Sequence, residues 1–313
     1  MYAKTLFDND VPVIYNTDHL SAHVGYSKSY LKRAVSHPKS FYRRFIIPKK
    51  NGGTRYLAEP LPSLKEIQRW ILENILYKKE VHPYAKAYSP GRTIKDNLKY
   101  HKKKAVVLSL DIEHFFDSIT SEKVENIFRT FGYSSIVSSI LTKLIMLNGA
   151  LAQGAPTSPH VSNLVLFDFD STIQKFSFEN KFMYTRYADD LTFSSSNLNP
   201  DLIISFVEKE LLHLNLKLNG KKTHLMPSSK RQVVTGVVVN EKIQAKRDYR
   251  MLIRQEMHFI KKFGLASHIK KKKIKNKNYL KHLIGKINYS LFLNPNDSEL
   301  AGYKTYLIGL IGT

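Results

Sequence analysis

The chain has 313 residues, with 49 Lys and Arg, 26 Asp and Glu and no cysteine, and its formal net charge is +23. The lack of cysteine excludes disulfides and cysteine-ligated zinc, and no apolar run reaches the ~18 residues that a membrane-spanning helix needs. The positive charge exceeds what solubility requires and favours a polyanionic partner such as a nucleic acid. The N-terminus lacks the apolar segment of a signal peptide, so we expect a soluble, cytoplasmic protein with no membrane partner.

Residues 1–46 are expected to form a small helical extension. A β-hairpin is predicted over Ile46–Leu57, where β-rich runs flank a turn at Asn51–Gly53. Lys50 and Arg55 would project from this hairpin. Both side chains suit phosphate, because Arg presents a bidentate fork and Lys a point charge. A basic turn that only faces water is the alternative.

A first carboxylate follows a predicted buried strand. Ser63–Glu66 has the pattern of a capping box and predicts the start of a helix. After it come Asn97 and His101, and then a continuous apolar run over Ala105–Leu110. Such a run predicts a buried strand, and Asp111 stands at its end.

Two helices and a polar loop come next. The spacing of apolar residues predicts helices over 122–131 and 135–147. The loop Gln153–Pro159 leads into a third helix, for which Ser158 is expected to be the N-cap and Pro159 the first helical residue.

Two adjacent acids occupy a predicted hairpin turn. Phe182–Arg186 and Leu191–Phe193 are β-rich and flank Tyr187–Asp190, so Asp189 and Asp190 lie at the tip. Neighbouring carboxylates repel each other unless a cation neutralises them. Together with Asp111 at a strand end, they could hold two Mg²⁺ ions, which clamp the attacking and leaving oxygens of a phosphoryl transfer.

The rest of the chain is predicted to contain more β structure and then basic helices. Asn199–Pro200 is expected to open a helix, and 216–223 is expected to form a strand and turn that carries Lys222. Val233–Val239 is predicted to be one β run, and 241–313 is predicted to be helical with a lysine-rich segment.

These motifs resemble those of the reverse transcriptases. Asp111 with Phe115–Phe116, then Gln153–Pro159, then Tyr187–Asp190 occur in that family's order and spacing, and the resemblance runs from about Ile47 to Val239. It implies an α+β right-hand polymerase fold with fingers, a ferredoxin-like antiparallel palm and a helical thumb. The corresponding division is 1–46 for an N-terminal extension, 47–104 for fingers with parts of 132–160, 105–240 for palm and 241–313 for thumb.

The resemblance also implies roles for individual residues. Asp111, Asp189 and Asp190 would be catalytic and bind two Mg²⁺ ions. A second set would contact the incoming dNTP, with Lys222 near the departing pyrophosphate and Phe116 against the sugar; this set comprises Lys50, Arg55, Phe116, Gln153, Gly154 and Lys222. Plain solvation is the alternative for Lys222. Many relatives have Pro where this chain has Ala152.

Within that family, the chain is most similar to retron reverse transcriptases. Their Asn-Ala-x-x-His element is partly matched, because Leu98 stands where Ala is usual, and their Val-Thr-Gly element is matched in full. The resemblance implies that these elements and the basic thumb bind RNA through Asn97, His101, Val234, Thr235, Gly236, Lys271, Lys272 and Lys273. His101 could instead cap or pack at a helix end, and the lysines could belong to a solvated loop.

A retron enzyme implies further partners and a product. It would copy part of a structured noncoding RNA into short single-stranded DNA, primed from an RNA 2′-hydroxyl, and serve anti-phage defence with a separately encoded effector protein. Another bacterial reverse transcriptase, of the group II intron or diversity-generating kind, is one alternative. A non-catalytic RNA-binding scaffold of the same fold is the other, although a scaffold has no need of three clustered acids.

Overall fold

The computed structural model describes residues 2–48 and 52–310, and its contacts divide the chain into two compact units. The first unit contains Met1–Arg92, Leu110–Leu191 and Asn199–Thr223. The second contains Thr93–Ser109, Thr192–Leu198 and His224–Thr313. These units cut the chain differently from the extension, fingers, palm and thumb, which remain a predicted division.

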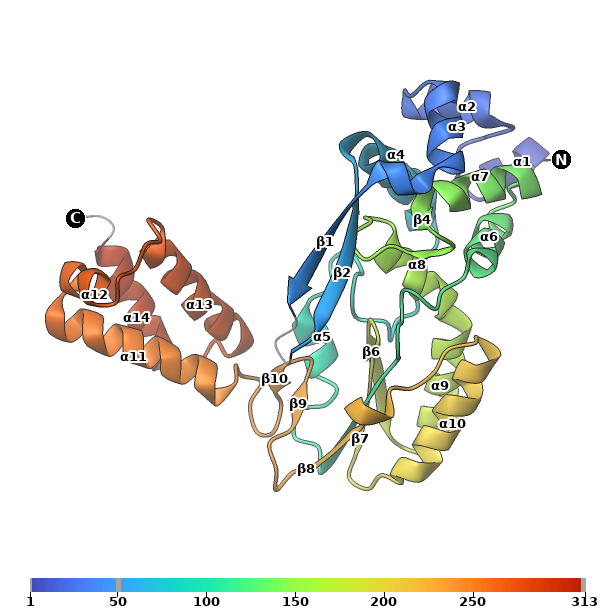
Figure 1. Cartoon of the computed structure of the whole chain (residues 1–313). Helices are drawn as coiled ribbons and strands as arrows, with labels where there is room; N and C mark the ends of the chain where they lie inside the picture. Colours follow the sequence, from blue (N-terminus) through green and yellow to red (C-terminus); the bar gives the residue numbers. More distant parts are fainter. Residues whose placement is uncertain (1, 49–51, 311–313) are drawn as a thin grey trace. The chain divides into compact units, whose positions relative to one another are not determined.

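The N-terminal extension is helical, with α1 (Tyr2–Asp8), α2 (Thr17–Val24) and α3 (Lys28–Ser36) drawn in blue in Figure 1. Helix α2 begins where the side chain of Asn16 accepts hydrogen bonds from the backbone N–H groups of Asp18 and His19, at 2.9 and 3.1 Å. It ends at Gly25, whose φ of 73° is the left-handed conformation that glycine adopts without strain.

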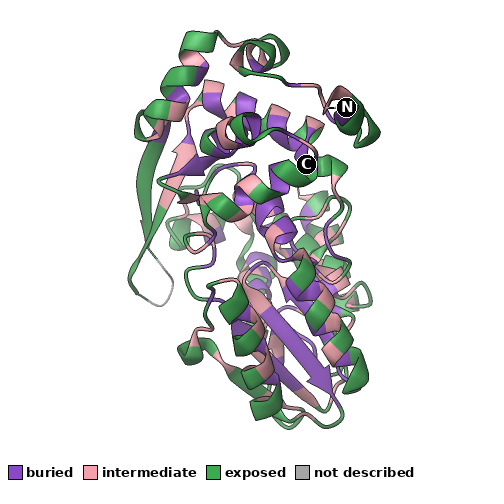
Figure 2. Cartoon of the chain, turned by 90° about the vertical axis from the view of Figure 1, so that its right-hand side faces the viewer, coloured by how far each residue is buried: buried purple, intermediate pink, exposed green. Residues whose placement is uncertain are grey.

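The predicted hairpin is present as β1 (Tyr42–Pro48) and β2 (Thr54–Pro60), paired antiparallel with Phe45 opposite Leu57. Figure 2 shows it as a largely exposed ribbon, and Tyr56 is 72% exposed. Lys50 lies outside the described residues, so its predicted contact with nucleotide stays a prediction.

Helix α4 (Pro62–Asn74) follows, but the predicted capping box at its start is wrong. The helix begins at Pro62, which has no N–H to satisfy, and Leu61 is the N-cap. The hydroxyl of Ser63 accepts instead from Tyr30 Oη at 2.9 Å, and the carboxylate of Glu66 accepts from Tyr26 Oη. Contacts with the extension therefore outcompete the local cap.

The first unit contains further helices. They are α6 (Ser121–Thr130), α7 (Ser135–Ile145), α8 (Ser158–Val165), α9 (Phe167–Glu179) and α10 (Pro200–His213), with short 3₁₀ turns at Pro38–Phe41, Leu76–Lys78 and Gly220–Lys222. Asn199 caps α10 as predicted. In α8 the N-cap is Thr157 and the first helical residue is Ser158, so the helix begins one residue earlier than predicted.

The central sheet has four strands in the order β6-β7-β3-β8. They are β6 (Met183–Tyr187), β7 (Asp190–Ser195), β3 (Val106–Asp111) and β8 (His224–Pro227), and β3 pairs antiparallel with β8. A two-residue pair, β4 (Met146–Leu147) with β5 (Ala150–Leu151), precedes the Gln153 loop. The predicted strands before Asp111 and around Tyr187–Asp190 are thus confirmed.

The second unit corrects one predicted strand. Val233–Val239 is not one β run but a hairpin of β9 (Val233–Val234) and β10 (Val237–Val238). Its turn is Thr235–Gly236, with φ values of 45° and 83°. Two successive positive φ angles fit the tight hairpin turn in which glycine is favoured. The second unit also holds α5 (Ile94–Leu98).

The last part of the described chain is helical, as predicted, with α11 (Arg247–Phe263), α12 (Leu265–Lys271), α13 (Tyr279–Leu293) and α14 (Ser298–Gly309). They share a core of Ile253, Met257, Ile260, Leu283, Ile287, Leu300 and Leu307. Across residues 2–48 and 52–310, no helix is both long and apolar enough to cross a membrane.

Candidate active site

Asp111 and the Asp189–Asp190 turn lie together in the first unit. The backbone N–H of Ile112 donates to the carbonyl of Asp189 at 3.0 Å, which ties the end of β3 to the turn. The N–H of Asn219 donates to the carbonyl of Asp111 at 2.8 Å. Asp111 is 5% exposed, whereas Asp189 and Asp190 are half-buried. The three predicted catalytic carboxylates therefore come from two segments far apart in sequence.

A buried ion pair supports the turn between β6 and β7. Arg186 and Asp170 are both 0% exposed, and Arg186 Nη2 donates to Asp170 Oδ2 at 2.5 Å. Arg186 Nη1 also donates to Asn163 Oδ1 at 2.9 Å and to the carbonyl of Ala188 at 3.2 Å. Ala188 has a φ of 60°, an uncommon conformation for a residue with a Cβ. Arg186 thus holds this strained turn from inside.

The pKa values of Asp189 and Asp190 are both raised. Burial, followed by the charge of Asp111, raises the pKa of Asp189. Burial, and then the charges of Asp189 and Asp111, raise the pKa of Asp190 to about 7. Such a surplus of negative charge in a partly desolvated place is the condition under which a cation binds.

Lys222 supplies one positive charge to this group. Its Nζ donates to both carboxylate oxygens of Asp111, at 2.9 and 2.8 Å. Partial burial lowers the pKa of Lys222, but the hydrogen bond and charge of Asp111 outweigh it and raise that pKa. The resemblance to reverse transcriptases predicts Lys222 near the active site. In the structure, its ammonium contacts the carboxylate of Asp111.

Two neighbours of the acids differ in how well the sequence identified them. Arg55, predicted from the hairpin, is exposed, and its charge opposes the rise in the pKa of Asp189. Tyr88 was missed. It is 46% exposed with a φ of 59°, and burial followed by the charge of Asp189 raises its pKa. Only the backbone strain and the acids around it single out Tyr88, and neither is visible in sequence.

The Gln153–Gly154 loop packs on strand β2. The N–H of Ala58 donates to the carbonyl of Gln153 at 3.0 Å. A Cβ on Gly154 would lie 2.8 Å from the carbonyl oxygen of Ala58, and the φ of Gly154 is 136°. Glycine is required here for both reasons, so the loop and the hairpin approach each other closely.

The two phenylalanines after Asp111 have different surroundings. Phe115 is 5% exposed and belongs to the core, whereas Phe116 is partly exposed. Their ring centroids lie 5.5 Å apart. Phe116 is therefore the ring that a nucleotide could reach, while Phe115 packs inside.

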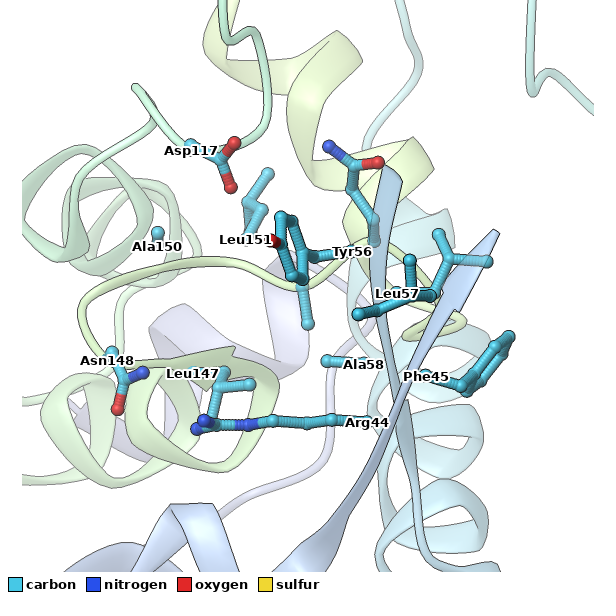
Figure 3. Close-up of a pocket in the computed structure, with 13 residues that line it drawn as sticks. Arg44, Phe45, Tyr56, Leu57, Ala58, Asp117, Leu147, Asn148, Ala150 and Leu151 are labelled. Carbon is cyan, nitrogen blue, oxygen red and sulfur yellow. The ribbon is translucent and has the colours of Figure 1, made fainter. Parts of the chain in front are cut away.

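A hollow of about 640 Å³ lies between the hairpin and the β4–β5 segment (Figure 3). Tyr56 offers an aromatic face to it, Arg44 extends toward Leu147 and Asn148, and Asp117 lies at its edge. Gln153 also lines it. An aromatic ring beside an arginine suits the bases and phosphates of a single strand.

The second unit encloses several of the residues that were predicted to bind RNA. Asn97 and His101 are both 0% exposed, and Val234 is 1% exposed. His101 Nδ1 lies 2.7 Å from Ser194 Oγ. In this structure these side chains lie inside the unit, and their predicted contact with RNA stays a prediction. Thr235 and Gly236 form the hairpin turn, so backbone conformation accounts for that glycine.

Exposed lysines surround the buried motif residues. A hollow of about 580 Å³ is lined by Lys95, Asp96, Lys99, Lys102, Lys103, Glu241, Lys242, Ile243, Leu293, Asn294, Pro295 and Asn296. Lys99 pairs with Asp96 at 3.1 Å and Lys103 with Glu241 at 3.7 Å. Within the described part of the chain, Lys102 and Lys242 have no acidic partner. The predicted Lys271, Lys272 and Lys273 are also exposed.

The donor set suits a hard divalent cation, because carboxylate oxygens are the ligands that Mg²⁺ prefers. In the positions described, however, no three acidic or histidine side chains are arranged closely enough to hold a metal ion. The ammonium of Lys222 already occupies both oxygens of Asp111. The three acids therefore lie together, but the carboxylate of Asp111 is already paired with Lys222.

Carboxylates at the end of β3 and at the β6–β7 turn, with a Gln-Gly loop packed on a hairpin, fit a template-directed nucleotidyltransferase. Residues 47–276 match the family model "Reverse transcriptase (RNA-dependent DNA polymerase)", which covers most of the chain. The chain belongs to the reverse transcriptase family and is an RNA-directed DNA polymerase that requires a divalent metal ion. The predicted α+β right-hand fold is confirmed.

Its relatives place it among the retron enzymes. It is 32% identical to the Retron Ec86 reverse transcriptase of Escherichia coli, over 80% of this chain and 79% of that one. It is 30% identical to the Retron Mx65 reverse transcriptase of Myxococcus xanthus, over 92% and 71%. It is 32% identical to the Retron Ec83 reverse transcriptase of Escherichia coli, over 80% and 82%. The predicted assignment to bacterial retron reverse transcriptases is confirmed.

Proposed function

We propose that Asp111, Asp189 and Asp190 form the catalytic centre and hold two Mg²⁺ ions. The observation that carries this proposal is the meeting of the three carboxylates, which raises the pKa of Asp190 to about 7 through burial and then through Asp189 and Asp111. When bound, such ions neutralise the charge of a transferring phosphoryl group and orient the attacking and leaving oxygens. Arg186 keeps the turn that carries two of the acids in place.

The neighbouring residues bind and select the dNTP. Arg55 and Lys222 are cations close to the acids and suit a triphosphate. Phe116 presents a partly exposed ring where a ribose 2′-hydroxyl would collide with it. Gln153 and Gly154 lie at the contact with β2, under the base pair being formed, and the Tyr56–Arg44 hollow receives the template strand.

The RNA is a structured noncoding RNA, and the product is a short single-stranded DNA joined to it through an RNA 2′-hydroxyl. Holding one RNA in one register requires contacts beyond the active site. The lysine-lined hollow of the second unit and the exposed Lys271–Lys273 provide phosphate contacts, which position a nucleic acid without reading its bases. The resulting RNA–DNA molecule serves anti-phage defence with a separately encoded effector protein.

The catalytic assignment is tested with Asp189→Asn. This variant should lose dNTP incorporation by at least about 100-fold, since a neutral amide is a weak metal ligand and removes charge that the reaction needs. RNA binding, measured by filter retention, should survive because phosphate contacts elsewhere hold the RNA. Incorporation at the wild-type rate would disprove the assignment.

Priming from a 2′-hydroxyl is tested by expressing the protein with its native flanking DNA. The purified protein should carry short DNA that stays joined to a ribonucleotide after RNase treatment and is released by an enzyme that cleaves 2′–5′ linkages. Asp190→Asn should remove the DNA and leave the RNA. Recovery of linear, 3′-primed DNA alone would favour a reverse transcriptase of the group II intron or diversity-generating kind.

A further inference from the structure

The contact between Lys222 and Asp111 occupies the oxygens that a metal ion would need. Lys222 Nζ lies 2.9 Å from Oδ1 and 2.8 Å from Oδ2. The Asp111 side chain is 7% exposed, while that of Lys222 is 56% exposed. One partner is therefore fixed inside the protein, and the other lies largely in solvent.

The backbone of Lys222 is anchored independently of its side chain. It ends the 3₁₀ turn Gly220–Lys222, and its N–H donates to the carbonyl of Asn219 at 2.9 Å. Asn219 is in turn bonded to the carbonyl of Asp111 at 2.8 Å. A flexible four-carbon stem on a fixed backbone can leave the carboxylate without any rearrangement of the fold.

Charge explains why a lysine lies there. Three carboxylates in one partly buried place repel one another, and a single ammonium offsets part of that repulsion. A divalent ion offsets more of it, but the ion and the ammonium would compete for the same two oxygens of Asp111. Both cannot bind Asp111 in this way at once.

We propose that Lys222 is an exchangeable internal cation: it neutralises Asp111 before a divalent metal binds, and metal binding displaces it. This inference rests on the proposed function only in that Asp111 is a metal ligand. Displacing Lys222 from Asp111 costs free energy and so weakens metal binding. Lys222 therefore sets the metal concentration at which the enzyme becomes active. It also couples metal binding to the release of a free ammonium beside the acids.

The first test measures Mn²⁺ binding to RNA-free protein by the electron paramagnetic resonance signal of free Mn²⁺. Lys222→Gln removes the charge at similar size, and it should tighten the first Mn²⁺ site by roughly 5- to 150-fold, the usual range for two coupled binding events. Lys222→Arg keeps the charge and should stay near wild type. Lys221→Gln, an exposed neighbour on the same turn, is the matched control and should have no effect.

The second test uses reciprocity, since a ligand that displaces Lys222 must also weaken its contact. Acylation of Lys222 by a lysine-selective reagent, followed by mass spectrometry, should become faster when Mn²⁺ is added, relative to Lys221 in the same sample. Unchanged acylation together with unchanged Mn²⁺ affinity in Lys222→Gln would overturn the inference. Weaker Mn²⁺ binding in that variant would also overturn it, because Lys222 would then support the site.

These outcomes separate the inference from the proposed function. If wild-type protein binds no Mn²⁺ and Asp189→Asn still polymerises, the catalytic assignment itself fails. If Asp189→Asn loses both Mn²⁺ binding and synthesis while Lys222→Gln binds Mn²⁺ like wild type, only the exchange by Lys222 fails.

Discussion

The residues of the polymerase motifs and those of the retron elements differ in where the structure places them. Asp111, Asp189 and Asp190 converge in the first unit, where Asp189 and Asp190 remain partly exposed. Asn97 and His101 are buried in the second unit. Residues that react must be presented to the substrate, whereas residues shared by a subfamily can instead form the framework beneath a binding surface. A match in sequence therefore does not by itself identify a contact.

Breaking the support of the catalytic turn should have the largest effect on stability. Arg186→Met leaves Asp170 buried without its partner, which costs about 3–5 kcal/mol in such ion pairs. Urea unfolding should show this loss. Primer extension with dNTPs by the protein that remains folded should also slow, because the carbonyl of Ala188 loses its hydrogen bond from Arg186.

Two variants control that experiment. Arg69→Met changes an exposed arginine of α4 and should shift the free energy of unfolding by no more than about 0.5 kcal/mol. The double variant Arg186→Met/Asp170→Leu removes both charges and should recover part of the stability. If Arg186→Met unfolds like wild type, the ion pair does not support the turn.

Sugar selection should respond next. Phe116→Ala removes the partly exposed ring and should raise rNTP incorporation relative to dNTP by roughly 10- to 200-fold, the usual worth of one steric contact. Single-nucleotide extension with each substrate measures the ratio. Phe115→Ala is the matched comparison, because loss of a core ring should lower stability and leave the ratio unchanged. A ratio that changes only in Phe115→Ala would assign the selection to the other ring.

The lysines that line the hollow of the second unit should contribute to RNA binding. Lys102→Gln/Lys242→Gln removes two cations without acidic partners from the hollow, and RNA affinity in 0.2 M salt should fall about tenfold, with a shallower salt dependence. Stability should not change. Lys175→Gln/Lys209→Gln, on the exposed faces of α9 and α10, is the charge-matched control. Equal losses in both double variants would mean that only net charge matters.

The elements that follow from local chemistry could be predicted from sequence. Asn199 caps α10, and the strands around Tyr187–Asp190 follow from their β-rich runs. Two features could not be predicted, because distant segments decide them. Tyr26 and Tyr30 take the polar groups of the expected capping box, and Tyr88 approaches the acids only in the folded chain.

The same reasoning applies within the candidate site. The acids were found because adjacent carboxylates in a turn need a cation, and Gly154 because the Gln-Gly pair belongs to a known motif. The burial of Asn97 and His101 could not be predicted, since a motif does not report burial, and their contact with RNA stays a prediction. Val233–Val239 was predicted as one β run because five of its seven residues are valine, which outweighed the turn signal of Thr235–Gly236.

The smallest expected effect is a dependence of the protein's stability on pH that comes from the protonation of Asp190. Burial, and then Asp189 and Asp111, raise the pKa of Asp190 to about 7 from an ordinary value of 3.8. Between these values the folded protein holds a proton that the unfolded chain has lost, so its stability falls as the pH rises through this window and levels off above about 7. In EDTA, Asp190→Asn should therefore become more stable than wild type as the pH rises from 5 to 8, by a few degrees in Tm, on the order of 1 kcal/mol.

Asp8→Asn, which changes an exposed acid of α1, is the control and should keep a constant difference in Tm from wild type across the same pH series. If the Tm values of Asp190→Asn and wild type change with pH in parallel, the three carboxylates do not repel one another in the folded chain. The catalytic region would then not differ from the buried residues of the second unit in its electrostatics.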